Sequence, residues 1–161
     1  MNKYVESEAN QHVMKLIQMG ADVKIVPGKM VYVTFDIEQN IQLAYVYNLN
    51  RKNKFFLERI KPYPMPVREF NTPDAICEII KIDVEQFRNA IKSHQIRKFI
   101  DINLEFHKLL LTFEDLFLYY NIKTETFAEI KGHLDAIHKT IHSAKESDDR
   151  VYFKKEPDNL D

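Results

Sequence analysis

Hydrophobic positions recur with two different periods along this chain, and the change of period separates helical from strand-rich parts. Near the N-terminus, Ala9, Val13, Leu16 and Ile17 repeat with the spacing of one helix face. Gly20 follows at a position where helices commonly end in a left-handed residue. After this glycine the apolar residues fall on every second position, which is the period of a β-strand. The pattern predicts an N-terminal helix followed by a sheet.

The strand-rich part predicts an antiparallel meander of three or four strands joined by polar turns, one of which covers residues 50–53. The strand-like runs cover residues 23–26, 30–37, 41–49 and 54–60. In the second run, Val33 and Phe35 fall on one face and Thr34 on the other, as expected where one face of the sheet is buried. Four prolines within residues 61–73 then end the pattern, so this segment is predicted to connect the sheet with helices.

The stretch after the prolines has two signals for the start of a helix. Thr72 precedes Pro73, which is an N-cap residue followed by proline at the first helical position. Asp83 is followed three residues later by Gln86, close to the pattern of a capping box. Together they predict two short helices over residues 73–93, with a turn near residues 81–83.

Two longer helices are predicted toward the C-terminus. Residues 96–120 keep a three-to-four-residue apolar spacing, which predicts one long and largely buried helix; alternation over residues 99–106 leaves a strand as the alternative. Residues 126–145 form a final amphipathic helix. The fold class is therefore α+β: a helix, a meander, then helices packed with the sheet. Residues 1–146 are expected to form a single domain, and residues 147–161 a polar, flexible tail with an apolar island at 151–153.

Composition excludes several classes of protein. A chain of 161 residues with 45% hydrophobic content can bury one core, and it has no apolar run of the length that crosses a bilayer. Cys77 is the single cysteine, so an intrachain disulfide is impossible. Three glycines do not provide the spacing of a dinucleotide-binding fingerprint or a phosphate loop, and no cofactor is predicted. A cytoplasmic protein without a membrane anchor is expected.

The stretch 73–93 resembles a helix-turn-helix, and this raises nucleic-acid binding as an alternative function. Its second helix would carry Gln86, Arg88, Asn89 and Lys92, side chains that can pair with bases or grip phosphate. Residues 51–98 carry a net charge of +5, with eleven Lys or Arg against six Asp or Glu. That surplus is modest for a DNA-binding surface, so a structural helical hairpin is the preferred interpretation.

The last helix carries the nearest approach to a metal site. Asp135, His138 and His142 lie along one flank, and histidines four residues apart have a spacing that suits a metal ion. Lys131 projects from the same flank and would repel a cation, and further ligands on facing helices are not evident in the sequence. These three residues are weak candidates, and we expect no bound metal.

These patterns predict a small cytosolic, non-enzymatic binding or regulatory protein that acts through protein–protein contacts and forms a homo-oligomer, most simply a twofold dimer. A catalytic residue is not predicted, because the sequence has no nucleophile elbow and its carboxylate pairs fit a polar helix edge. The alternatives are a nucleic-acid-binding regulator using residues 73–93 and a metal-dependent enzyme using the last helix.

Overall fold

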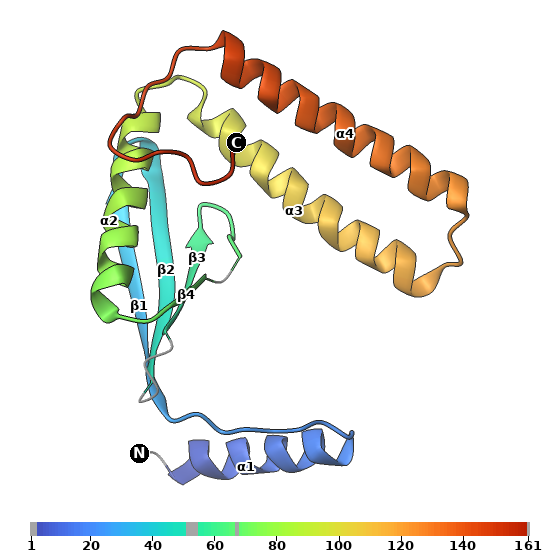
Figure 1. The fold of residues 1–161 in the computed structure, drawn as a ribbon. Coiled ribbons are helices and arrows are strands. Elements are labelled where there is room, and N and C mark those ends of the chain that lie inside the picture. The colour runs from blue at the N-terminus through green and yellow to red at the C-terminus, as the bar shows by residue number, and fades with distance from the viewer. Residues whose placement is uncertain (1–2, 51–54, 67, 161) are drawn as a thin grey trace.

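The computed structural model describes residues 3–50, 55–66 and 68–160, and it has the predicted α+β architecture. An N-terminal helix precedes a four-stranded antiparallel sheet, and three helices follow (Figure 1). The predicted turn over residues 50–53 lies, apart from Asn50, outside the described residues. In chain order the elements are α1 (Lys3–Gln18), β1 (Gly28–Ile37), a short 3-10 turn (Glu38–Asn40), β2 (Ile41–Asn50), β3 (Phe55–Lys61), β4 (Arg68–Phe70), α2 (Pro73–Ala90), α3 (Ile96–Tyr119) and α4 (Thr124–Ser147).

The sheet is a meander in which the strands lie side by side in sequence order and each neighbouring pair is antiparallel. The β1–β2 hairpin places Ile37 opposite Ile41 across the 3-10 turn. Asn40 has a φ of 57°, a left-handed conformation that asparagine adopts more readily than most residues. Along β1, Val33 and Phe35 are partly buried and Thr34 is exposed, so the predicted faces are confirmed.

The edges of the sheet differ from the sequence prediction. The strand predicted over residues 23–26 is wrong: this segment is irregular, and β1 begins only at Gly28. Pro27 lacks the N–H that a paired strand would donate, and the chain there leads away toward α1. β4 forms inside the proline-rich segment, where Phe70 pairs with Phe55 of β3.

α2 is one continuous helix of 18 residues, so the prediction of two short helices over residues 73–93 is wrong. Its start is as predicted, because the Thr72 hydroxyl accepts a hydrogen bond from the backbone N–H of Ala75 at 3.3 Å. The expected turn near residues 81–83 is helical. The helix-turn-helix geometry is therefore absent from this described segment.

The continuity of α2 follows from its buried stripe. Ile76, Ile80, Val84 and Phe87 follow one another at helical spacing, and all are buried. Neither glycine nor proline interrupts the helix after its first residue. A turn at the predicted position would have broken this stripe and withdrawn part of it from the sheet.

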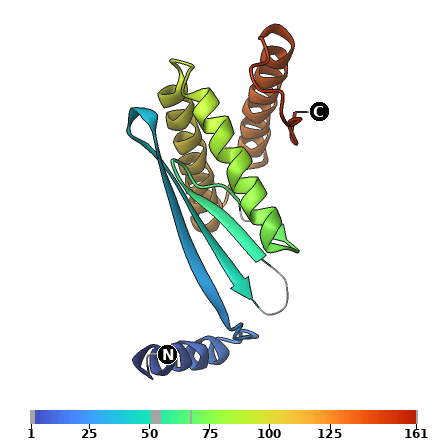
Figure 2. The same ribbon diagram turned by 90° about the vertical axis from the view of Figure 1, so that its left-hand side faces the viewer.

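The core lies between one face of the sheet and α2, which runs along that face (Figure 2). Its members come from β2, β3 and α2, together with Tyr63 after β3, Ile91 after α2 and Ile96 at the start of α3. Fully burying one large apolar side chain contributes about 1.5–3 kcal/mol. The buried apolar residues are Ile41, Leu43, Ala44, Tyr45, Phe55, Leu57, Tyr63, Ile76, Ile80, Val84, Phe87, Ile91 and Ile96.

α3 and α4 form a helical arm, residues 96–147, that leaves this core and extends away from the sheet (Figure 1). The strand alternative over residues 99–106 is excluded, because these residues lie inside α3. The expectation that this helix is largely buried is wrong: Ile96 is buried and Ile100 packs partly against the core, but the apolar side chains beyond them are largely exposed. In the described residues, no helix combines the length and apolar character needed to span a membrane.

α1 lies at the opposite end of the molecule from the arm, beside the start of β1 (Figure 1). It ends as predicted, with Gly20 in a left-handed conformation at φ 92°. The backbone N–H of Ala21 returns to the carbonyl of Leu16 at 3.0 Å and closes the helix.

Candidate functional site

Arg59 is a charged residue whose side chain is buried, with only 8% of its surface exposed. It lies on β3 two residues after Leu57 and four after Phe55, so the alternation of the strand directs it to the same buried face. Removing a guanidinium from water is costly unless the charge is paired and its donors are bonded. Its surroundings are therefore the first place to look for a functional arrangement.

Asp83 of α2 supplies the opposite charge. Nη1 of Arg59 donates to both carboxylate oxygens at 2.8 Å, and the hydroxyl of Tyr45 donates to one of them at 2.7 Å. These three side chains link β2, β3 and α2 in one polar cluster at the edge of the core. We call this the Arg59–Asp83–Tyr45 cluster.

Two aromatic rings pack against the Arg59 guanidinium. Its central carbon lies 4.5 Å from the ring centroid of Tyr63 and 4.9 Å from that of Phe87, both within cation–π range. The Nε atom of Arg59 is buried and has no hydrogen-bond acceptor among the described residues. The guanidinium is thus held firmly in place while one of its donors is left without a partner.

The two tyrosines of this site are neutral donors at ordinary pH. Burial raises the pKa of Tyr45 well above its usual value, and the neighbouring Asp83 carboxylate raises it further. Burial also raises the pKa of Tyr63, although the Arg59 guanidinium opposes this shift. Asp83 and Arg59 are therefore the charged members of the group, and their formal charges cancel.

A pocket of about 350 Å³ adjoins this cluster. Its floor and walls come from β3, the segment after it, the flank of α2 nearest β3 and the start of α3. Residues 155–159 of the C-terminal tail form a further wall. We call this cavity the tail pocket, because the tail lies across it.

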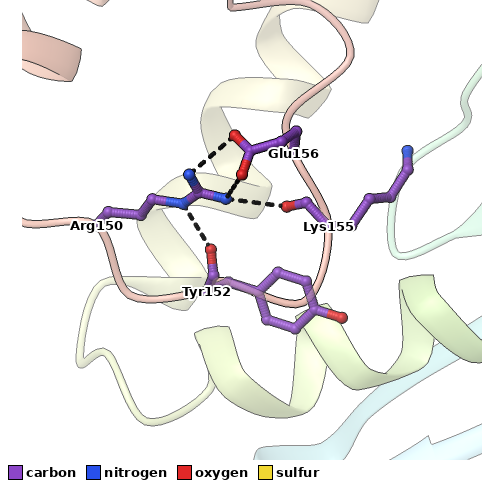
Figure 3. Close-up of polar contacts among 4 residues, drawn as sticks. All are labelled: Arg150, Tyr152, Lys155 and Glu156. Atoms are coloured by element: carbon purple, nitrogen blue, oxygen red, sulfur yellow. Dashed lines mark hydrogen bonds and ion pairs between the residues drawn. The ribbon is translucent and has the colours of Figure 1, made fainter.

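The tail is shaped by Arg150, whose side chain gathers the following residues into a loop (Figure 3). Its guanidinium donates to both carboxylate oxygens of Glu156 at 2.9 Å and to the backbone carbonyls of Tyr152 and Lys155 at 2.8 and 3.1 Å. A bidentate arginine–carboxylate pair fixes direction as well as charge. The loop therefore has a defined shape before it meets the rest of the chain.

Two contacts join this loop to α2. Lys154 Nζ lies 2.7 Å from a carboxylate oxygen of Glu85, and Asn89 donates from Nδ2 to the backbone carbonyl of Val151 at 3.1 Å. Tyr152 is partly buried, and its hydroxyl has no hydrogen-bond partner among the described residues. Of the apolar residues 151–153, Tyr152 is therefore partly buried against the rest of the chain, whereas Val151 and Phe153 are exposed.

Comparison with known proteins leaves this geometry to be interpreted on its own. No family model, curated protein or solved structure matches the chain. Its function is therefore inferred from its own residues.

The four predicted nucleic-acid-binding residues lie on the last turns of α2 and just after its end. Gln86 lines the tail pocket on the β3 flank of α2, whereas Arg88 lines a separate hollow with Val33 of β1. Asn89 is engaged by the tail, and Lys92 follows the end of α2. Gln86, Arg88 and Lys92 are exposed; Arg88 and Lys92 are four residues apart and share one side of the helix, whereas Gln86 lies on the flank toward the tail pocket.

The predicted metal flank lies on the surface of α4. Asp135, His138 and His142 are exposed and border a shallow hollow, and Lys131 is paired with the Asp135 carboxylate. This lysine lowers the pKa of Asp135 through its hydrogen bond. Across the described parts of the chain, His, Cys, Asp and Glu side chains nowhere gather in a group of three with the arrangement of a metal site.

We expect the purified protein to carry no stoichiometric transition metal, because a one-sided histidine flank opposed by Lys131 provides too few ligands. Elemental analysis of the protein by mass spectrometry measures this directly. Near-equimolar zinc, iron or manganese that disappears in a His138→Ala/His142→Ala variant would contradict the expectation.

The sequence interpretation missed Arg59, Asp83 and the tail pocket. A signal for Arg59 was present, since it shares the alternation of Phe55 and Leu57 and therefore points inward. Asp83 was interpreted as a helix start because its spacing to Gln86 imitates a capping box. The contribution of the tail depends on an ion pair between residues 69 positions apart, which no local pattern encodes.

Proposed function

We propose that this chain is a small, non-enzymatic, cytoplasmic binding protein that associates with a second copy of itself through the α3–α4 arm. The observation that carries the proposal is the exposed apolar surface of α3. Ile102, Phe106 and Leu109 follow one another at helical spacing and are 55%, 45% and 55% exposed. Contiguous apolar surfaces of this kind commonly mark interaction sites.

The arm is supported internally where its two helices approach each other. The ring of Phe127 on α4 meets those of Phe113 and Phe117 on α3 at centroid distances of 6.2 and 6.0 Å, both edge to face. This cluster lies near the connection between the helices and joins them into one unit. The apolar side chains of both helices can therefore be buried together when a partner helix packs against them.

A second copy is the simplest partner for such a surface. Self-complementary twofold interfaces are the commonest form of association in soluble oligomers, and two amphipathic helices can bury matching stripes against each other. Mixed charges on α3 and α4 border the apolar positions and would form the polar rim of such an interface.

The alternative functions have less support. The nucleic-acid interpretation loses its geometric basis with the continuous α2, and the formal net charge of the chain is −1. An enzyme using the last helix would need further metal ligands or a nucleophile beside Asp135 and His138. Both residues lie on an exposed flank of the helix.

We expect multi-angle light scattering to give a dimer, roughly twice the 19.2 kDa mass of the chain, at tens of micromolar protein. Leu109→Asp should shift the protein to monomer, because a carboxylate placed in the apolar interface is costly to desolvate. The helix itself should tolerate this change, since Leu109 is largely exposed in the single chain.

His107→Asp is the matched control, because it introduces the same carboxylate two residues away on another side of α3. Its oligomeric state should equal that of the unmodified protein. A wild-type protein that stays monomeric over this concentration range would refute self-association and leave the arm to a different protein partner.

Mixed-sequence duplex DNA at low salt provides the test of the nucleic-acid alternative. We expect no gel shift, because the helix-turn-helix geometry is absent from α2 and the formal net charge of the chain is −1. Should a shift appear, Arg88→Ala ought to cost about 1–3 kcal/mol on a specific site if this residue contacts a base. Lys92→Ala ought to reduce the salt dependence by about one unit if it contacts phosphate. These two results together would favour a nucleic-acid-binding regulator over a protein that acts through self-association.

A further inference from the structure

We propose that the tail pocket binds a small, planar organic carboxylate that is anchored by the Arg59 guanidinium. The pocket volume of about 350 Å³ falls within the range of small-molecule sites. Apart from Phe99 in the first turn of α3, the pocket lining lies outside the arm, so this inference stands whether or not the chain self-associates.

The anchor is argued from the donors of Arg59. A guanidinium carries five N–H groups, and the bonds to Asp83 both come from Nη1. Nε lacks an acceptor anywhere in residues 3–50, 55–66 and 68–160, although the side chain is more than nine-tenths buried. A buried donor without a partner is unfavourable and is commonly satisfied by a bound molecule or water. Arg59 also lines the pocket, and a modest shift of its enclosed side chain would bring Nε within reach of a ligand oxygen there.

The shape of the ligand is argued from the rings around the guanidinium. Tyr63 and Phe87 pack against Arg59, and the ring of Phe99 meets that of Tyr63 edge to face at 5.7 Å. All three aromatic residues line the pocket, together with aliphatic side chains such as Leu57 and Ile79. Aromatic walls of this kind favour a flat, unsaturated body over a branched or highly polar one.

The charge of the ligand is argued from the ionic groups at the pocket. Arg59 is balanced by Asp83, Lys155 is paired with Asp158, and Glu156 is held by Arg150 from outside the pocket. Arg68 contributes a further guanidinium to the lining. The lining thus carries three cationic side chains and three carboxylates, and its two arginines are the residues best suited to bidentate recognition of a ligand carboxylate.

The test uses the full chain with 2-naphthoate as probe and 2-naphthamide as its neutral counterpart, with binding followed by saturation-transfer NMR and calorimetry. We expect the acid to bind about tenfold more tightly than the amide, because its hydrogen bonds are charge-assisted. Failure of both probes to bind would overturn the proposal, and it would leave ordered water as the partner of Nε. Equal affinity for the acid and the amide would also overturn it.

Three variants locate the bound probe. Ala90→Leu should abolish binding by filling the pocket that Ala90 lines, whereas Ala128→Leu, an exposed site on α4, should not change it. Arg68→Gln should lower the affinity for 2-naphthoate severalfold and leave the affinity for 2-naphthamide unchanged. Binding of the acid that survives Ala90→Leu would place the probe elsewhere and refute the assignment.

Arg59→Lys tests the anchor while keeping a positive charge beside Asp83. This change removes the Nε donor and the planar fork, so the preference for acid over amide should disappear. Thermal melting measured beside the titration verifies that the variant is folded. A folded Arg59→Lys protein that retains the tenfold preference would exclude Arg59 as the anchor.

Discussion

Replacing Asp83 with alanine is expected to lower the free energy of unfolding by about 3–5 kcal/mol. The substitution leaves the Arg59 guanidinium buried without its carboxylate and removes the acceptor of the Tyr45 hydroxyl. An unpaired buried charge costs far more than the ion pair contributes, because the remaining ion has lost water without gaining a partner. Urea unfolding followed by far-ultraviolet circular dichroism measures the change.

Glu78→Ala is the matched control on the same helix. Glu78 lies 3.7 Å from Lys81 in an exposed ion pair, and exposed pairs contribute little to stability. A second comparison is the double variant Arg59→Met/Asp83→Leu, which removes both charges and should recover most of the lost stability. The interpretation of the cluster would be wrong if Asp83→Ala and Glu78→Ala had equally small effects.

Phe87→Ala is expected to destabilise the protein by about 3–5 kcal/mol, through lost burial and the cavity left behind. Phe87 is buried in the stripe of α2, and its ring packs against the Arg59 guanidinium and lies 6.3 Å from the ring of Tyr63. The same urea titration applies.

Phe117→Ala removes the same side chain from an exposed position of the arm. Phe117 is 59% exposed, and its ring meets that of Phe127 at 6.0 Å, so the single chain should lose much less stability than it does with Phe87→Ala. This comparison is best made in dilute protein, where association through the arm does not contribute. A similar loss for both variants would mean that the arm belongs to the cooperative core together with α2.

The order of elements was predictable because it depends on local chemistry. Thr72 and Pro73 signal the start of α2, and Gly20 signals the end of α1, through groups only a few residues away. The alternation of Val33 and Phe35 likewise identifies the inner face of β1. Such signals are complete within one stretch of sequence, so they do not require knowledge of the tertiary structure.

The errors arose where a residue's role depends on a distant partner. Asp83 imitates a helix start, but its carboxylate pairs with Arg59, 24 positions earlier. The apolar spacing of α3 correctly predicts a helix. The same spacing occurs in helices buried in a core and in helices whose apolar side chains are exposed, so it does not predict the burial of α3. The tail pocket was unpredictable for the same reason, since it combines β3 and α2 with residues 155–159.

In the described part of the chain the buried core is confined to residues 41–96, and this has a consequence for how the molecule can vary. α3 joins the core through its first turns, and its 24 residues then extend about 36 Å at 1.5 Å per residue. Whole helical turns added to or removed from the far end of the arm would change this reach without altering any buried core side chain. If the chain self-associates as proposed, the arm is an adjustable spacer whose length would set the distance between the pocket of one copy and the other copy.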